Sequence, residues 1–230
     1  MERDDVYFIV TNQTETYKGQ QLVDGLNELF VPFDDGTDVP YPTGAFEIYS
    51  RLTVWQSYGQ GINIRTVILP RDDTDLKIIS PVENDKLRTN KIILGKKYSL
   101  AEVETYEKLR IPLMTMDTAS GHGFLKILDK WLVGEYFYSV NAIDWACQNG
   151  HVEVLNWWKK SKLEPLYTPE CLKMALENGH VNVLKWFLQS DWPLSFDDKV
   201  IQLAKIHDQT EILELLLKSR LSISESPQEL

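Results

Sequence analysis

Cysteine is scarce in this chain, and long apolar runs are missing. Only two cysteines, Cys147 and Cys171, occur among 230 residues, too few for the disulfide framework of a secreted domain. We expect both to be buried, reduced thiols. No apolar run approaches the ~20 residues of a membrane-spanning helix, and the N-terminal MERDD lacks the apolar core of a signal peptide. These absences predict an intracellular protein without a membrane partner.

Clustered basic charge is missing as well. The chain has 24 Lys and Arg against 34 Asp and Glu, a net charge of −10, and the basic residues form no stripe. Nucleic-acid binding depends on clustered Lys and Arg that neutralise phosphates. We therefore expect no nucleic-acid partner.

What the sequence does contain is a repeated segment. The stretch ACQNGHVEVLNWW at residues 146–158 returns 29 residues later as ALENGHVNVLKWF, and degenerate copies begin at Ala119 and Ala204. Each copy has a small residue, then a turn residue, an aliphatic pair and a large apolar residue. This spacing predicts two helices per unit, with Gly150 and Gly179 in the turns between them. A single helical hairpin cannot bury its own apolar side, so the copies predict a stacked solenoid.

The repeated run A-x-x-x-G-H-x-x-V-L resembles the core of an ankyrin repeat, in the degenerate, shortened form found in proteins of giant amoeba-infecting DNA viruses. The period of 27 to 29 residues is shorter than the ankyrin norm of about 33, and the T-P-L-H signature is replaced by NAID at 141–144. The resemblance covers residues 111–220 and implies about four helix pairs joined by short loops, with weak or absent β-hairpin fingers.

The residues before the repeats follow a different pattern, with short β-rich runs between turn residues. Candidate strands lie at residues 6–11, 46–49, 62–69, 76–79 and 91–94. A helix is expected at 99–109, where Ser99 and Glu102 are spaced as a capping box. We place the domain boundary near Arg110.

This first part also resembles the domain that precedes the repeats in the same viral proteins. The matching blocks are TNQTETYKGQQLVDGLN, TGAFEIYS, the G-x-x-I-R-x-V-x-L-P of residues 61–70, and NKIILG. The predicted fold class is an α+β N-terminal domain (1–110) followed by an all-α ankyrin-like solenoid (111–220), with a disordered tail at 221–230.

No spacing typical of a catalytic or metal centre is found. The repeats contain no nucleophile with a neighbouring base and no Gly-rich phosphate loop. The carboxylates Asp34-Asp35 and Asp72-Asp73-x-Asp75 lack EF-hand spacing and are interpreted as solvated loop charges. We interpret all four histidines as turn residues of successive units, about 10 Å apart, rather than metal ligands: His122, His151, His180 and His207. We expect no enzymatic activity, cofactor or metal.

One enzymatic alternative stays open for the N-terminal part. The Tyr17-Lys18-Gly19 motif, the Gly44–Phe46 strand and the late run at 90–94 follow in an order similar to ADP-ribosyltransferase-like folds. Such enzymes need a late Glu, which Lys91-Ile92-Ile93 does not offer. The resemblance would therefore imply a degenerate relative with ligand-binding or vestigial activity.

The favoured interpretation is a non-enzymatic protein–protein interaction module that binds a host protein in the host cytoplasm during viral infection. Solenoids bind through exposed positions of their first helices. The pattern places on that face Asp144, Gln148, Lys173, Glu177 and Gln202. Four tryptophans are assigned to the core instead: Trp145, Trp157, Trp158 and Trp186.

The C-terminal end of the array carries apolar residues that no further unit covers. The run 215–217 consists of three leucines, and Leu221 and Ile223 follow. Terminal units normally need a polar outer face. Two arrangements would satisfy this end: residues 221–223 fold back over the last helix pair, or two chains form a homodimer there.

Overall fold

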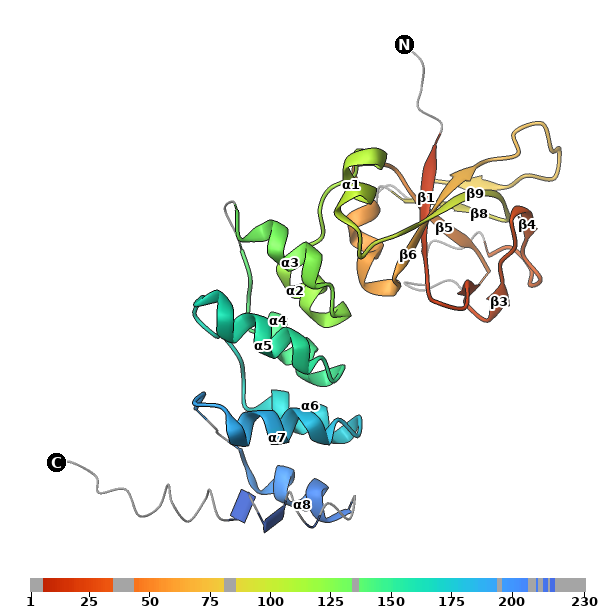
Figure 1. Cartoon of the computed structure of the whole chain (residues 1–230). Helices are drawn as coiled ribbons and strands as arrows, with labels where there is room; N and C mark the ends of the chain where they lie inside the picture. The colour runs from red at the N-terminus through yellow and green to blue at the C-terminus, as the bar shows by residue number, and fades with distance from the viewer. Residues whose placement is uncertain are drawn as a thin grey trace. The chain divides into compact units, whose positions relative to one another are not determined.

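The computed structural model describes residues 6–34, 44–80, 86–133, 137–193, 196–206, 210, 213–214 and 216–217. The contacts divide the chain into two compact units, residues 1–114 and 115–230 (Figure 1). No helix in the described part is long and apolar enough to cross a membrane. Several features expected from the sequence lie outside the described residues: the tail at 221–230, the arrangements proposed for residues 221–223, Asp35 and His207.

The first unit is built on a seven-stranded antiparallel sheet with the order β4-β9-β6-β1-β5-β8-β7. Its strands are β1 (Tyr7–Thr11), β4 (Gly25–Glu28), β5 (Phe46–Tyr49), β6 (Asn63–Ile68), β7 (Ile78–Ile79), β8 (Lys86–Thr89) and β9 (Lys91–Ser99). The short strands β2 (Thr16–Tyr17) and β3 (Gln20–Gln21) form a separate hairpin. A 3-10 helix η1 (Val54–Gln60) and the helix α1 (Val103–Leu109) complete the unit.

Both faces of this sheet are buried near β1. Ile9 packs with Phe46 and Ile92 in a cluster on one face, whereas Phe8 and Val10, which alternate with it along the strand, are also buried. All the strands expected from the sequence are present. β4 and β8 were missed because GLNE and KLRT lack the apolar alternation of a strand and form by pairing with β9 and β5.

The predicted capping box of α1 is wrong. The helix begins at Val103 with Glu102 at the N-cap position, and the Glu102 side chain makes no cap hydrogen bond. Ser99 ends β9 instead, and its hydroxyl accepts a hydrogen bond from the amide of Ala101. The spacing of a capping box was present, but the strand continues through its first residue.

A buried arginine connects the loops of the first unit. Arg65, 4% exposed, donates to the carboxylates of Glu15 and Asp24 and to the carbonyl oxygen of Gly95. A charge at this depth requires such partners. Arg65 is the arginine of the G-x-x-I-R block, and a Cβ on Gly61, the glycine of the same block, would lie 2.2 Å from the carbonyl oxygen of Thr11. In this block, Gly61 allows the backbone to pass close to Thr11, and Arg65 forms ion pairs with Glu15 and Asp24.

The second unit consists of helix pairs stacked in succession (Figure 1). The pairs are α2 (Met116–His122) with α3 (Leu125–Trp131), α4 (Asn141–Gln148) with α5 (Val152–Ser161), and α6 (Glu170–Glu177) with α7 (Val181–Gln189); α8 (Asp198–Ile206) begins the fourth. The first helix of each unit packs against the first helix of the next. The described parts of the connections between pairs contain no strand. The predicted solenoid is confirmed.

The glycine turns have the predicted left-handed conformation, and a histidine of the next unit covers two of them. Gly123, Gly150 and Gly179 have φ of 76°, 75° and 77°. A Cβ on Gly150 would lie 2.5 Å from Nδ1 of His180, and one on Gly123 would lie 3.1 Å from His151. The imidazole ring of one unit therefore packs against the glycine turn of the unit before it.

Candidate functional site

The first helices of the first two units each carry an aspartate that binds the following unit. The carboxylate of Asp117 in α2 accepts from the amide (2.9 Å) and hydroxyl (2.6 Å) of Ser139. Asp144 in α4 occupies the equivalent position and accepts from the amide (2.9 Å) and hydroxyl (2.6 Å) of Thr168. Asp144 is only 5% exposed. Its predicted exposed position is therefore wrong, since the next unit covers it.

Lys173 in α6 occupies the same position in the third unit. It is half-buried, and its ammonium lies 2.8 Å from a carboxylate oxygen of Glu170 on the same helix. The hydrogen bond that Lys173 donates to Glu170 raises the pKa of Lys173, and the charges of Glu170, Glu177 and Asp197 add to this effect. Asp197, 29 residues after Thr168, accepts from the amides of Lys199 and Val200 at the start of α8, and its charge reaches Lys173 only as a minor effect. Lys173 is thus a partly exposed group paired within its own helix, and its role in partner binding stays a prediction.

The remaining predicted positions are accessible. Glu177 and Gln202 are exposed and Gln148 is half-buried, each on a first helix. Their role in partner binding stays a prediction.

The four tryptophans assigned to the core differ in burial. Trp158 is buried and donates from its indole to the hydroxyl of Ser120 in the unit before it. Trp157 and Trp186 are half-buried and form a second repeated link between units: the indole of Trp157 donates to Asp129, and that of Trp186 donates to Asn156. The assignment to the core is correct for Trp158 alone.

Trp145 lies on the exposed face of α4 and is 38% exposed. Its side chain packs over Gly121 of α2, where a Cβ would lie 3.1 Å from the Cβ of Trp145. The missing side chain at Gly121 leaves room for the indole against the neighbouring helix. A large aromatic group held in place on the first-helix face is the kind of side chain that dominates protein interfaces.

The other candidate groups have structural partners. Cys147 and Cys171 are buried, unbridged thiols as predicted, and their mutual hydrogen bond, with burial, raises the pKa of Cys147. Asp73 is not a solvated charge: it lies 2.8 Å from the buried ammonium of Lys91, whose hydrogen bond lowers the pKa of Asp73. Within the ranges that the structure describes, no group of three or more His, Cys, Asp or Glu could hold a metal ion.

Helix pairs with glycine turns, joined by contacts that recur from unit to unit, define an ankyrin-type repeat protein. The family model "Ankyrin repeats (many copies)" matches residues 143–188. Relatives of the chain include three proteins of Acanthamoeba polyphaga mimivirus. It is 34% identical to "Uncharacterized protein L696" over 133 residues (56% of this chain, 42% of that one). It is 30% identical to "Putative ankyrin repeat protein R896" over 148 residues (64% and 39%).

The third relative is covered almost completely. "Uncharacterized protein R869" is 34% identical over 137 residues, which make up 55% of this chain and 97% of that protein. The chain belongs to this family of mimivirus ankyrin-repeat proteins, although it spans only about two-fifths of the length of the first two relatives. The 148-residue alignment is longer than the second unit, so similarity extends into the first unit. No solved structure matches the chain, and the ADP-ribosyltransferase-like alternative stays a prediction.

Proposed function

We propose that the chain is a non-enzymatic adaptor that binds a protein of the infected host, in the host cytoplasm, through the exposed face of its first repeat helices. Ankyrin repeats are protein–protein interaction modules, and the family is viral. The observation that supports this surface most directly is Trp145. It is a large aromatic side chain on the face that a solenoid presents to its partners.

Charged and amide side chains lie on the same helix as Trp145 and on the first helices that follow it. Gln148 lies on the same helix as Trp145, and Glu177 and Gln202 lie on the first helices of the next two units. A central aromatic group within a polar rim is the usual composition of a binding hot spot. Asp144, which we expected on this face, instead binds the following unit, whereas Lys173 stays a candidate contact residue.

The test compares partner capture by matched variants of the full chain. The wild-type protein captures a partner from amoeba lysate, and the purified partner is then titrated against each variant. Trp145→Ala should weaken affinity by about 30-fold or more, the equivalent of about 2 kcal/mol for a hot-spot aromatic. Glu177→Lys should weaken it too, whereas the same kind of charge reversal on the second helices, Lys160→Glu in α5, should leave it unchanged.

Melting curves of all variants separate a lost contact from lost folding. If the purified partner binds Trp145→Ala and Glu177→Lys with wild-type affinity while deletion of residues 1–114 abolishes binding, the interaction surface belongs to the first unit and the proposal is wrong.

A further inference from the structure

The repeat spacing aligns three apolar side chains across the exposed face of the first helices. Trp145 in α4, Met174 in α6 and Leu203 in α8 follow one another at intervals of 29 residues. Trp145 is 38% exposed, and the side chains of Met174 and Leu203 are half-buried. Because α4 packs against α6 and α6 packs against α8, these three positions form one apolar stripe along the stack of helices (Figure 1).

Polar side chains border this stripe on both sides in the second and third units. They lie four positions before and three positions after the apolar residue of each helix, and they are Asn141, Gln148, Glu170 and Glu177. In these two units the stripe is therefore only one side chain wide. In the fourth unit Ile206, which is 73% exposed, widens it.

The spacing of the stripe indicates the conformation of a bound polypeptide. The axes of packed neighbouring helices lie about 8–10 Å apart. Every third side chain of a polyproline II segment lies on one face at intervals of about 9 Å, whereas the same-face side chains of a β-strand repeat at about 6.6 Å. An amphipathic α-helix presents an apolar face at least about 100° wide, which is broader than a stripe of single side chains. Aromatic side chains such as Trp145 are also the usual contact surface for polyproline II segments.

One carboxylate at the border of the stripe has no partner in the described part of the chain. The ammonium of Lys173 lies 2.8 Å from Glu170, so these two charges neutralise each other. The side chain of Glu177 is exposed, and it forms no ion pair or hydrogen bond with any described residue. Glu177 lies one helical turn beyond Met174. A lysine or arginine next to the residue that contacts Met174 would therefore complement its charge.

We propose that the first-helix face binds a proline-containing linear segment of its protein partner, in the polyproline II conformation, with large apolar side chains at every third position and a basic side chain directed at Glu177. About seven residues in this conformation reach across three units. The inference rests on the proposed adaptor function and adds Met174 and Leu203 to the contact surface. The competing occupants are an amphipathic helix and a folded surface of the partner.

The test titrates labelled synthetic peptides with the full chain and follows their fluorescence anisotropy. The first peptide has leucine at every third position, arginine beside the central leucine, and proline at the remaining positions. The second has the same composition with leucine at every second position, and the third is an amphipathic helix with leucine at heptad spacing. The first should bind saturably and about tenfold or more tightly than the second.

The other outcomes of this titration overturn the proposal. Equal binding of the first two peptides would show apolar adsorption without a preferred spacing. Tighter binding of the third peptide would assign the stripe to a helix. If none of the peptides binds saturably, the face does not accept a linear segment.

Variants of the full chain identify the contacts of the first peptide. Met174→Gln and Leu203→Gln should each weaken its binding about fivefold or more, because an amide replaces an apolar contact, whereas Met174→Leu should retain it. Leu163→Gln changes a half-buried leucine outside the first helices and should leave binding unchanged. Glu177→Gln should weaken binding about threefold, and it should have no effect on a peptide whose arginine is replaced by glutamine. Melting curves check that each variant is folded.

The purified partner distinguishes failure of this inference from failure of the proposed function. If Trp145→Ala weakens partner binding but Met174→Gln and Leu203→Gln do not, the adaptor function stands and the linear segment is wrong. Wild-type affinity in all three variants contradicts the proposed function itself.

Discussion

The link between Asp144 and Thr168 allows the stability of the repeat stack to be tested at a single carboxylate. Asp144→Ala removes both hydrogen bonds and leaves the amide and hydroxyl of Thr168 without their acceptor. Hydrogen bonds to a charged group contribute about 1.5–3 kcal/mol each, but removing the carboxylate also removes the cost of burying it. We expect the free energy of unfolding to fall by about 2 kcal/mol.

The neutral isostere should behave differently, because burial raises the pKa of Asp144 despite the two hydrogen bonds from Thr168. The charged form is therefore disfavoured in the folded state. In Asp144→Asn the side-chain carbonyl oxygen would still accept from the Thr168 amide without this charge, so the substitution should cost less than about 1 kcal/mol.

The sign of the pH dependence follows from the same shift. A carboxyl whose pKa is higher in the folded state than in the unfolded state binds its proton more tightly when folded. Its contribution to stability is therefore present below the unfolded value, 3.8 for Asp, and is lost as the pH rises through the folded value. The stability of Asp144→Asn relative to wild type should rise with pH in that window and then stay constant.

Urea unfolding of the full chain followed by tryptophan fluorescence measures these effects. Six of the seven tryptophans lie in the second unit, and only Trp55 lies in the first, so the signal reports mainly on the repeats. Glu177→Ala, at an exposed position, should stay within about 0.5 kcal/mol of wild type. The reasoning is refuted if Asp144→Ala is as stable as this control, or if Asp144→Asn loses as much stability as Asp144→Ala.

Two further stability predictions concern positions with no direct role in the proposed binding surfaces. Gly150→Ala should destabilise the repeats by clearly more than Gly179→Ala: both lose about 1–2 kcal/mol to left-handed strain, but at Gly150 the new Cβ also meets His180, whereas at Gly179 it meets none of the described residues. Equal urea midpoints for this pair would contradict the stacking of histidine on glycine. In the first unit, Arg65→Met should cost about 2 kcal/mol or more, because it leaves the largely buried carboxylate of Glu15 and the carbonyl oxygen of Gly95 without their donor, whereas the exposed Asp24 adds little. Near-ultraviolet circular dichroism during unfolding checks this, and a loss below about 1 kcal/mol would show that the cluster contributes little.

The sequence predicted the repeat architecture well because its signals are local and recur. The glycine turns and apolar stripes of each unit act within about 15 residues, so a helical projection describes them correctly. The same projection failed for Asp144, since it places a side chain on a helix face but cannot show that Thr168 of the next unit covers that face. The recurrence of Asp117 with Ser139 and of Asp144 with Thr168 at equivalent positions could have revealed the contact.

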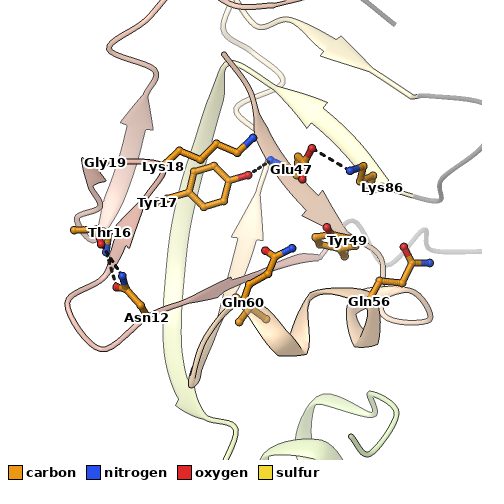
Figure 2. A pocket seen from close by; sticks show the side chains of 11 residues that line it. Asn12, Thr16, Tyr17, Lys18, Gly19, Glu47, Tyr49, Gln56, Gln60 and Lys86 are labelled. Atoms are coloured by element: carbon orange, nitrogen blue, oxygen red, sulfur yellow. Dashed lines mark hydrogen bonds and ion pairs between the residues drawn. The ribbon is translucent and has the colours of Figure 1, made fainter. Parts of the chain in front are cut away.

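The tryptophans and the first unit show a second limit of sequence reasoning. Hydrophobicity assigned both Trp145 and Trp158 to the core. Trp158 is buried, whereas Trp145 packs over Gly121 of the neighbouring helix and stays exposed at the surface. In the first unit, a pocket gathers side chains from five separate elements (Figure 2). No local pattern predicts such an assembly, because it depends on strand pairing between segments far apart in the chain.

The contacts between units also explain how similar repeats keep their order. The first-helix position pairs Asp117 with Ser139 and Asp144 with Thr168, whereas the third junction presents Lys173 and Asp197. If α8 packed on α4 instead of α6, the carboxylate of Asp197 would lie near that of Asp144 in place of the ammonium of Lys173. Like charges in such a place raise the free energy of the wrong arrangement without affecting the correct one. We therefore expect the lysine at position 173 to favour the correct register of the stack, in addition to the binding role predicted for it from the sequence.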